Sequence, residues 1–177
     1  MRKLKNRELE RISVENFKIS KKTPISIILD NVRSAINVGS VFRTSDAFRI
    51  EKLFLCGITA FPPNNEIRKS ALGAENVVEW EYRRSTEEVV FALRKEGFKI
   101  LAVEQVEDST YLDYYNYDGS PIALIFGNEV SGVSQSVIDL CDGCLEIQQI
   151  GTKHSMNISV CAGIVMWDFW RKINQKF

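Results

Sequence analysis

The stretch IALIFGNEVSG, residues 122–132, indicates how this chain folds. It begins with five apolar residues, Ile122–Phe126, a length typical of a buried strand and short for a helix. Gly127 ends the run, and an amide and a carboxylate follow at once in Asn128 and Glu129. An acid at the end of a buried strand is solvated, paired with another group, or part of a site.

Similar apolar runs recur along the chain, and helical patterns separate them. The alternation predicts an α/β fold with a mostly parallel sheet and helices on both faces. Ligands of such sheets bind beyond the carboxyl ends of the strands, so Glu129 is a candidate site residue. The other expected strands are 25–30, 52–57, 98–105 and 144–148. One expected helix carries Val38, Val41, Phe42 and Phe48 on one face. The other expected helices are 67–73, 85–96, 133–141 and 157–172.

The composition is ordinary for a globular protein, with 45% hydrophobic and 26% charged residues among 177. This length predicts one domain, placed at residues 22–177, after a short basic arm at residues 1–21 whose Leu4, Leu9 and Ile12 recur at helical spacing. No apolar run approaches the roughly 20 residues of a membrane span. The charged start lacks a secretory signal, so we expect a cytoplasmic protein.

The charge is unevenly distributed although the net charge is zero. Residues 1–84 hold 16 Lys and Arg against 10 Asp and Glu, and residues 85–177 hold 7 against 13. This asymmetry permits a basic binding face, and scattered surface charge would give the same counts.

Several classes of site are not indicated. The chain has no G-x-G-x-x-G, no phosphate-binding P-loop and no G-x-S-x-G, and His154 is its one histidine. Cys141 and Cys144 form a lone C-x-x-C that leads into a strand-like run, where only His154 is near enough to add a ligand. Cys56 and Cys161 lie in apolar surroundings typical of core residues. We expect no metal site.

Polar residues gather in three segments. In the first, Asn37 lies near a helix start, and small residues beside Arg43 leave its guanidinium room to reach a phosphate. A surface arginine on an amphipathic helix is the alternative. In the second, Gly127 and Glu129 precede Gly132, and a turn with a solvated acid is the alternative.

The third segment runs from Ile147 through a loop into the sequence ISVCAGIVMWDFW, residues 158–170. This helix is apolar almost all round and should be buried on most sides, in part against a second subunit. Ser155 and Asn157 lie at its start, where simple N-capping is the alternative to a functional role.

In chain order, N-x-G-x-x-x-R from residue 37, F-G-N-E-x-x-G from residue 126 and I-x-x-x-G-x-x-x-S-x-N-x-S-x-x-A-G-I from residue 147 resemble the SpoU/TrmH family of RNA 2′-O-ribose methyltransferases. The stretch RKSALGAE, residues 68–75, also looks like that family, and the resemblance covers about residues 22–172. It implies a C-terminal trefoil knot, a homodimer, S-adenosylmethionine bound in the knot, and methylation of a ribose 2′-hydroxyl in RNA. Small size and a short basic arm favour tRNA over rRNA.

The resemblance also implies roles for individual residues. Arg43 would contact the target ribose and its phosphate, and Glu129 would orient Arg43 or Asn37. Gln148 and Gln149 stand where the family usually has proline and methionine. The full expectation is catalytic Asn37, Arg43, Glu129, Ser155 and Asn157, cofactor-binding Gly127, Ile147, Met156, Val103 and Ile150, and RNA-binding Arg33, Arg68 and Lys69.

Two other functions compete with methyl transfer. One is a knotted RNA-binding dimer without catalysis, which would not need an intact set of site residues. The other is a hydrolase that uses His154 and Ser155, although adjacent residues rarely form a nucleophile–base pair.

Overall fold

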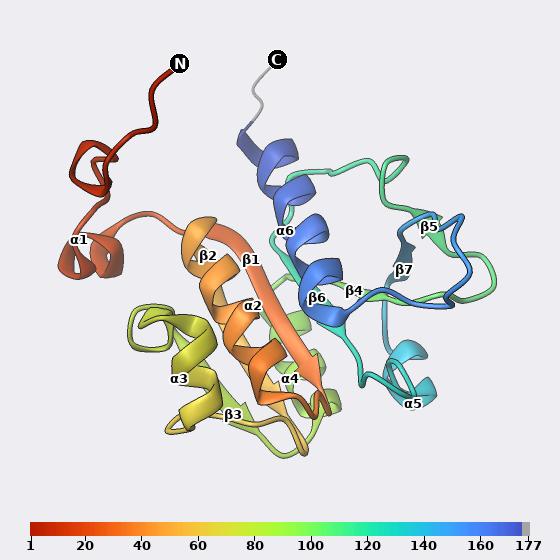
Figure 1. Cartoon of the computed structure of the whole chain (residues 1–177). Coiled ribbons are helices and arrows are strands. Elements are labelled where there is room, and N and C mark those ends of the chain that lie inside the picture. The colour runs from red at the N-terminus through yellow and green to blue at the C-terminus, as the bar shows by residue number, and fades with distance from the viewer. Residues whose placement is uncertain (175–177) are drawn as a thin grey trace.

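The computed structural model describes residues 1–174, apart from the side chain of Asn6. Within them, seven strands form one sheet in the order β3-β2-β1-β6-β4-β7-β5, and every strand pair is parallel (Figure 1). The α/β prediction is confirmed. The strands are β1 (Thr23–Asp30), β2 (Ile50–Cys56), β3 (Trp80–Arg83), β4 (Lys99–Val103), β5 (Thr110–Tyr111), β6 (Ile122–Phe126) and β7 (Gly143–Glu146).

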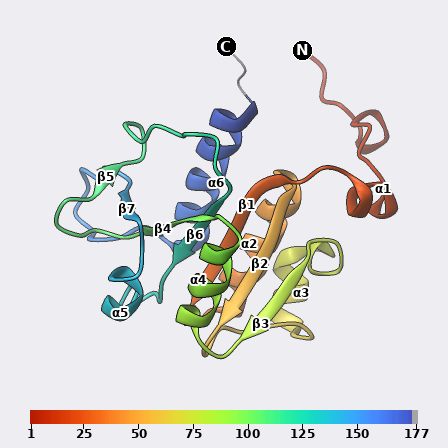
Figure 2. The ribbon, with the colours of Figure 1, turned by 180° about the vertical axis from the view of Figure 1, so that it is seen from behind.

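Helices cover both faces of the sheet. Helices α2, α3 and α6 lie on one face (Figure 1), and α4 and α5 lie on the other (Figure 2). The helices are α1 (Val14–Ile19), α2 (Ala35–Ala47), α3 (Asn65–Ala71), α4 (Thr86–Lys95), α5 (Gln135–Ile138) and α6 (Ile158–Asn174), with short 3-10 turns at Asn6–Glu8 and Ala74–Asn76.

The central strand β1 explains why the fold has two cores. Successive side chains of a strand point to opposite faces. Ile27 and Leu29 therefore join the core under α2, α3 and α6, whereas Ile28 joins the core under α4 and α5. Phe42 and Phe169 are fully buried in the first core, which is the larger of the two.

Polar side chains fix the starts of the helices. Ser34 caps α2 by accepting a hydrogen bond from the backbone N–H of Asn37 at 3.3 Å. Asn64 and Ser85 cap α3 and α4 in the same way. These caps satisfy N–H groups that the helix itself leaves free. They also orient the loops that precede the helices, which lie at the carboxyl edge of the sheet.

Two strands and the arm differ from the sequence-based expectation. Strands β3 and β5 were not predicted, because WEYR and TY are polar edge segments without an apolar run. Among the described side chains of the arm, only Phe17 is buried, while Leu4, Leu9 and Ile12 are exposed. Their helical spacing therefore does not produce one amphipathic helix.

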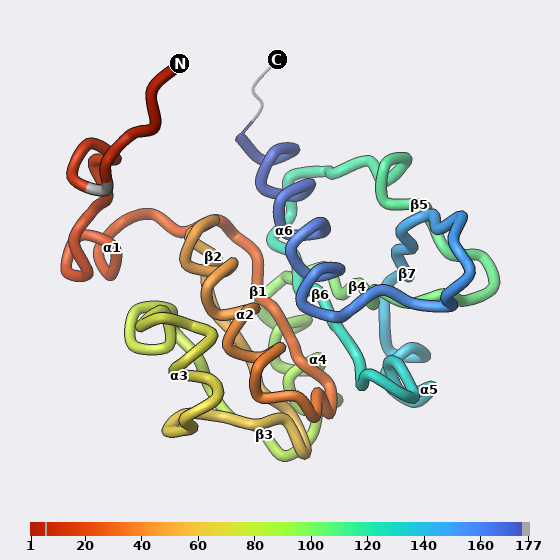
Figure 3. The backbone as a smooth tube through the Cα atoms, in the orientation of Figure 1, coloured from red at the N-terminus to blue at the C-terminus, as the bar shows by residue number. Residues whose placement is uncertain are grey.

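The crossover between β4 and β6 holds the C-terminal part of the chain in place. The N–H of Leu112 donates to the carbonyl of Glu146, the last residue of β7, at 2.8 Å. The carbonyl of Leu112 accepts from Nζ of Lys172 on α6 at 2.7 Å. Figure 3 traces the chain from β7 back to α6 beside this crossover. Threading of α6 as a trefoil knot agrees with this path and stays a prediction.

Helix α6 is buried on one side only. Ala162, Val165 and Phe169 have no exposed surface, but Val160 is 53% and Trp167 50% exposed. The expected burial on most sides included a second subunit, so a single chain does not test it and it stays a prediction. No helix of residues 1–174 has the length and hydropathy of a membrane span.

Candidate functional site

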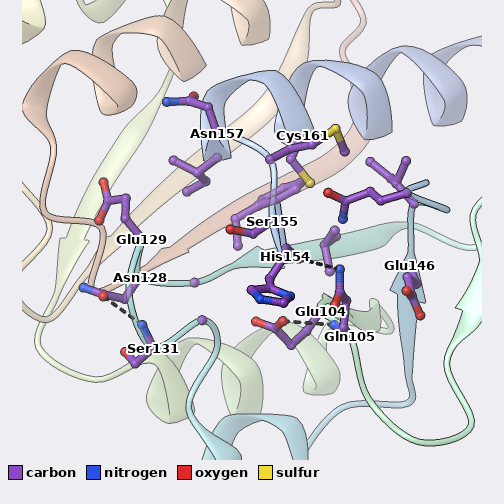
Figure 4. Close-up of a pocket in the computed structure, with 18 of the residues that line it drawn as sticks. Glu104, Gln105, Asn128, Glu129, Ser131, Glu146, His154, Ser155, Asn157 and Cys161 are labelled. Atoms are coloured by element: carbon purple, nitrogen blue, oxygen red, sulfur yellow. Dashed lines mark hydrogen bonds between the residues drawn. The ribbon is translucent and has the colours of Figure 1, made fainter. Parts of the chain in front are cut away.

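A pocket of about 570 Å³, the main pocket, lies at the carboxyl edge of the sheet. It is formed by the ends of β4, β6 and β7 and by the segment before α6 (Figure 4). Strands β6, β4 and β7 are consecutive in the sheet, so the segments that follow them converge. The lining residues are 103–105, 126–132, 145–147, 149, 154–158 and 161.

The two glycines of the β6 segment let its loop close on itself. Asn128 and Gly132 exchange two backbone hydrogen bonds, at 3.0 and 2.9 Å. A Cβ on Gly127 would lie 2.1 Å from the backbone of Gly132 and Val133. Gly132 has a φ of +67°, and a Cβ there would lie 2.1 Å from a carboxylate oxygen of Glu104. Side chains at these positions would open the loop.

Glu104 braces the same loop from β4. Its Oε1 accepts from the N–H of Gln105 and its Oε2 from the N–H of Val133, both at 2.9 Å. Gln105 in turn donates to the carbonyl of His154 at 3.0 Å (Figure 4). The sequence analysis did not assign a role to Glu104, although its position at a strand end was the available signal.

Glu129 connects the β6 loop to the start of α2. Its Oε1 accepts from the N–H of Ser34 at 3.0 Å and from Nδ2 of Asn37 at 3.1 Å, and its Oε2 accepts from the N–H of Arg33 at 3.0 Å. Burial acts to raise the pKa of Glu129, but these hydrogen bonds outweigh it, and the pKa lies below its usual value. The carboxylate is therefore charged at neutral pH.

Asn37 extends this connection to α6. It is buried, and its Oδ1 accepts from Nδ2 of Asn157 at 3.2 Å. The chain Glu129–Asn37–Asn157 thus joins one residue from each of the three polar segments. Asn157 also accepts from the N–H of Ser159, so it caps α6 as well as joining the site. The cap is therefore present, and a functional role for Asn157 stays a prediction.

Arg43 lies apart from this group. It is exposed on α2, and within residues 1–174 its guanidinium forms no hydrogen bond or ion pair. Of the two partners expected for Glu129, the single chain shows Asn37 and not Arg43. The acid is paired, as expected, but the residue itself remains exposed.

The remaining expected residues divide into two groups. Val103, Gly127, Ile147, Ser155 and Met156 line the main pocket together with Glu129 and Asn157. The others lie outside it.

Ile150 is 97% exposed and outside the pocket, so a single chain gives it no contact with a ligand there. Lys69 pairs with Glu66 at 2.8 Å. Arg33 is exposed at the start of α2, and Arg68 is exposed on α3.

The charge of the main pocket is one-sided. Glu104, Glu129 and Glu146 line it, and its described lining includes no lysine or arginine. Cys161 also lines it, and burial raises the pKa of this thiol to about 11, so it is protonated at neutral pH. The arrangement suits a positively charged ligand rather than a phosphate.

Comparison with known proteins identifies the family. The SpoU rRNA Methylase family is matched over residues 24–167.

The chain belongs to this SpoU family.

Relatives of the SpoU family resemble the chain at modest identity. A tRNA (guanosine(18)-2′-O)-methyltransferase of Thermus thermophilus is 26% identical over 165 residues, which are 93% of this chain and 84% of that protein. A Staphylococcus saprophyticus protein whose name refers to the TrmH family is 28% identical over 162 residues, 91% of this chain and 64% of its own length. Three curated relatives with the same kind of name are matched over 59 to 64% of their lengths.

Solved SpoU-family structures share the fold. The A. aeolicus TrmH/SpoU tRNA modifying enzyme superposes with a TM-score of 0.82 at 23% identity, over 92% of this chain and 83% of that one. An AdoMet-bound rRNA methyltransferase from Sinorhizobium meliloti gives a TM-score of 0.79 at 24% identity, over 85% and 57%. At these identities, the likeness is evidence of the fold.

Proposed function

We propose that the protein transfers the methyl group of S-adenosylmethionine to a ribose 2′-hydroxyl of a structured RNA. The observation that carries this proposal is the hydrogen-bonded chain Glu129–Asn37–Asn157 at the mouth of an acidic pocket, in a member of the SpoU family. We favour tRNA over rRNA, because a tRNA (guanosine(18)-2′-O)-methyltransferase of Thermus thermophilus aligns with 93% of this chain. A cytoplasmic location is part of the same proposal.

The main pocket fits S-adenosylmethionine in size and charge. Its volume of about 570 Å³ is within the usual range of cofactor sites. Val103, Leu145 and Met156 offer apolar surface to an adenine, and Glu104 and Glu146 offer negative charge to the cationic groups. Bound there, the cofactor supplies a methyl group already activated on a positively charged sulfur.

The protein must then position the ribose and stabilise charge on its oxygen. Glu129 fixes Asn37, and Asn37 fixes Asn157, so the two amides are held before RNA binds. The guanidinium of Arg43 would stabilise negative charge that develops on the 2′-oxygen. It does not serve as the base, because arginine keeps its proton throughout the physiological range. An RNA phosphate or a water molecule accepts the proton.

A homodimer would bring Arg43 to this position. In a single chain, Arg43 is exposed on α2 on the same helical face as Ile36, which is 55% exposed. Ile164 and Trp167, at 37% and 50%, continue the exposed surface on the neighbouring helix α6. We propose that a second copy covers this apolar surface and that Arg43 of the partner subunit completes the main pocket.

RNA would approach along the carboxyl edge of the sheet. Arg33 lies there at the start of α2, and Arg68 and Lys69 lie on α3 beside it. The arm, residues 1–21, adds further positive charge and precedes the domain that we place at residues 22–177. These basic groups would contact phosphates and position the RNA without reading its sequence.

The activity can be tested with purified protein, S-adenosylmethionine and unmodified tRNA and rRNA transcripts, with 2′-O-methyl nucleosides measured by mass spectrometry. Arg43→Ala should lower methyl transfer at least about 100-fold and leave the cofactor affinity in calorimetry within twofold. Lys95→Ala, an exposed cation at the end of α4, is the control and should change neither. Cofactor binding by wild type is also the decisive measurement against the non-catalytic RNA-binding dimer.

If Arg43→Ala retains wild-type turnover, the role of Arg43 is wrong. If wild type binds no S-adenosylmethionine, the non-catalytic alternative replaces the proposed function.

A further inference from the structure

A second pocket, the α3 pocket, lies beside α3 and belongs to neither the main pocket nor the core. It has a volume of about 470 Å³ and is formed by the loop after β2, by α3 and by the start of β3. Its lining residues are Pro62, Pro63, Asn64, Asn65, Arg68, Glu75, Asn76 and Trp80. We propose that the α3 pocket binds an unstacked nucleotide of the substrate RNA, other than the nucleotide that is methylated.

A row of aromatic rings lies beside the α3 pocket and reaches its wall at Trp80. The ring of Phe61 lies 4.7 Å from that of Tyr82 and 6.4 Å from that of Trp80, with a 29° angle to Trp80. Phe61 is 45% exposed and Tyr82 37% exposed. The hydroxyl of Tyr82 donates to the carbonyl of Gly57 at 3.1 Å, and Trp80 also packs on buried Phe42.

These contacts hold exposed rings in a fixed position. RNA-binding proteins use such rings to stack bases that are not paired in a helix. A ring that served only to fill the core would be buried, whereas Phe61 is exposed. Core packing alone therefore does not account for its position.

The charge of the α3 pocket suits a phosphate at its rim. The guanidinium of Arg68 has no hydrogen-bonding or ion-pair partner in the described part of the chain. Of the nearby acids, Glu66 pairs with Lys69 and Glu81 with Lys52, and the carboxylate of Glu75 accepts hydrogen bonds from the N–H of Gly73 and the side chain of Asn76. Arg68 is therefore the cation left to bind an anion, and a guanidinium binds phosphate through two oxygens.

Amides and one carboxylate supply hydrogen bonds for a base. The Oδ1 of Asn64 accepts from the N–H groups of Glu66 and Ile67, which fixes this side chain at the pocket wall. Glu75 is 8% exposed, and one of its oxygens accepts from the N–H of Gly73 at 3.0 Å. A carboxylate has further acceptor sites, which suit the N–H groups on the pairing edge of a base.

The α3 pocket lies within reach of the main pocket. Strand β1 stands between β2 and β6, so the ends of β2 and β6 are about 10 Å apart, and the loop after β2 leads from there to the α3 pocket. Asn31 joins them: its Oδ1 accepts from the N–H of Ile58, and its carbonyl accepts from Nδ2 of Asn128. One RNA strand can therefore contact both pockets. The inference rests on the proposed function for the identity of the ligand as RNA.

The test compares Phe61→Ala and Arg68→Gln with matched controls on α4, Phe91→Ala and Lys95→Gln, which are equally exposed but lie on the other face of the sheet. Phe61→Tyr keeps a ring for stacking and serves as the rescue variant. The probe is the fluorescein-labelled transcript that wild type methylates, or bulk tRNA if it methylates none. Binding is measured by fluorescence anisotropy at one salt concentration, and the cofactor affinity is measured by calorimetry.

Phe61→Ala and Arg68→Gln should each weaken RNA binding at least about fivefold, and raise the KM for RNA by the same factor with kcat nearly unchanged. The controls, Phe61→Tyr and the cofactor affinity of every variant should stay within twofold of wild type. RNA affinity that is unchanged in Phe61→Ala and Arg68→Gln, or lowered equally in the α4 controls, would overturn the proposal and leave a protein segment as the alternative occupant.

The two proposals fail in different ways. If wild type methylates no RNA, the proposed function fails, and the anisotropy measurement still decides the α3 pocket. If methylation is observed but the two variants bind RNA as wild type does, only the α3 pocket proposal fails.

Discussion

Replacement of Glu129 by alanine tests the connection between the β6 loop and α2. The substitution removes the acceptor of three hydrogen bonds of 3.0 to 3.1 Å, from the N–H groups of Arg33 and Ser34 and from the side chain of Asn37. A hydrogen bond to a charged group contributes about 1.5–3 kcal/mol when protected from water. Because Glu129 is exposed, water compensates for part of the lost hydrogen bonding. We expect the free energy of unfolding to fall by about 2 kcal/mol in total.

The assay is urea unfolding at pH 7, followed by circular dichroism at one protein concentration. For a chain of this length, the expected loss corresponds to a fall in Tm of about 4–8 °C. Glu107→Ala, an exposed acid without a partner in the described residues, is the control and should stay within about 0.5 kcal/mol of wild type.

The effect should also depend on pH. The folded-state pKa of Glu129 lies below its usual value, so its carboxylate contributes stability that is fully present above the unfolded pKa of about 4.3 and is lost as the pH falls through the folded pKa. The gap between wild type and Glu129→Ala should therefore narrow in acid. Equal stability of the two proteins at pH 7, or a gap that widens in acid, would refute the reasoning.

Three further substitutions test other parts of the structure. Gly127→Val should abolish measurable cofactor binding in calorimetry, because its Cβ would lie 2.1 Å from the backbone of Gly132 and open the loop; retained affinity would contradict this. Phe169→Ala should lower the free energy of unfolding by about 3–5 kcal/mol in urea, since the ring is fully buried, and a loss below 1 kcal/mol would argue against this core. Asp30→Ala removes a buried acceptor of hydrogen bonds from Thr86 and Ser134 and should lower the free energy of unfolding by about 2–4 kcal/mol in the same assay. A free energy near that of wild type would show that water takes the place of the Asp30 carboxylate.

The central strands were predictable because their apolar runs are long. The expected strands at 25–30 and 122–127 match β1 and β6 to within two residues at each end. Edge strands such as β3 carry polar residues, because one side of an edge strand is free and its faces are only partly covered. A run such as WEYR has neither an apolar stretch nor clear alternation, so sequence periodicity could not identify it.

The members of the hydrogen-bonded chain Glu129–Asn37–Asn157 were predictable but their contacts were not, and their roles in catalysis stay a prediction. Strand ends and local spacing pointed to Asn37, Glu129 and Asn157, yet nothing local in the sequence shows that Glu129 binds the side chain of Asn37, 92 positions earlier. Such contacts follow from the strand order, which places β1 beside β6. For the same reason, the role of Glu104 became visible only when its carboxylate was found against the β6 loop.

The hydrogen-bonded chain Glu129–Asn37–Asn157 has a consequence for the order of events during synthesis. Asn157 bonds to a residue that leaves the ribosome 120 positions before it, so the site cannot be assembled until nearly the whole domain has been translated. Early folding of β1, α2 and β2 would give a stable but inactive nucleus. Long-range pairings of this kind also slow folding. A nascent chain therefore has no complete main pocket before its last helix has been made.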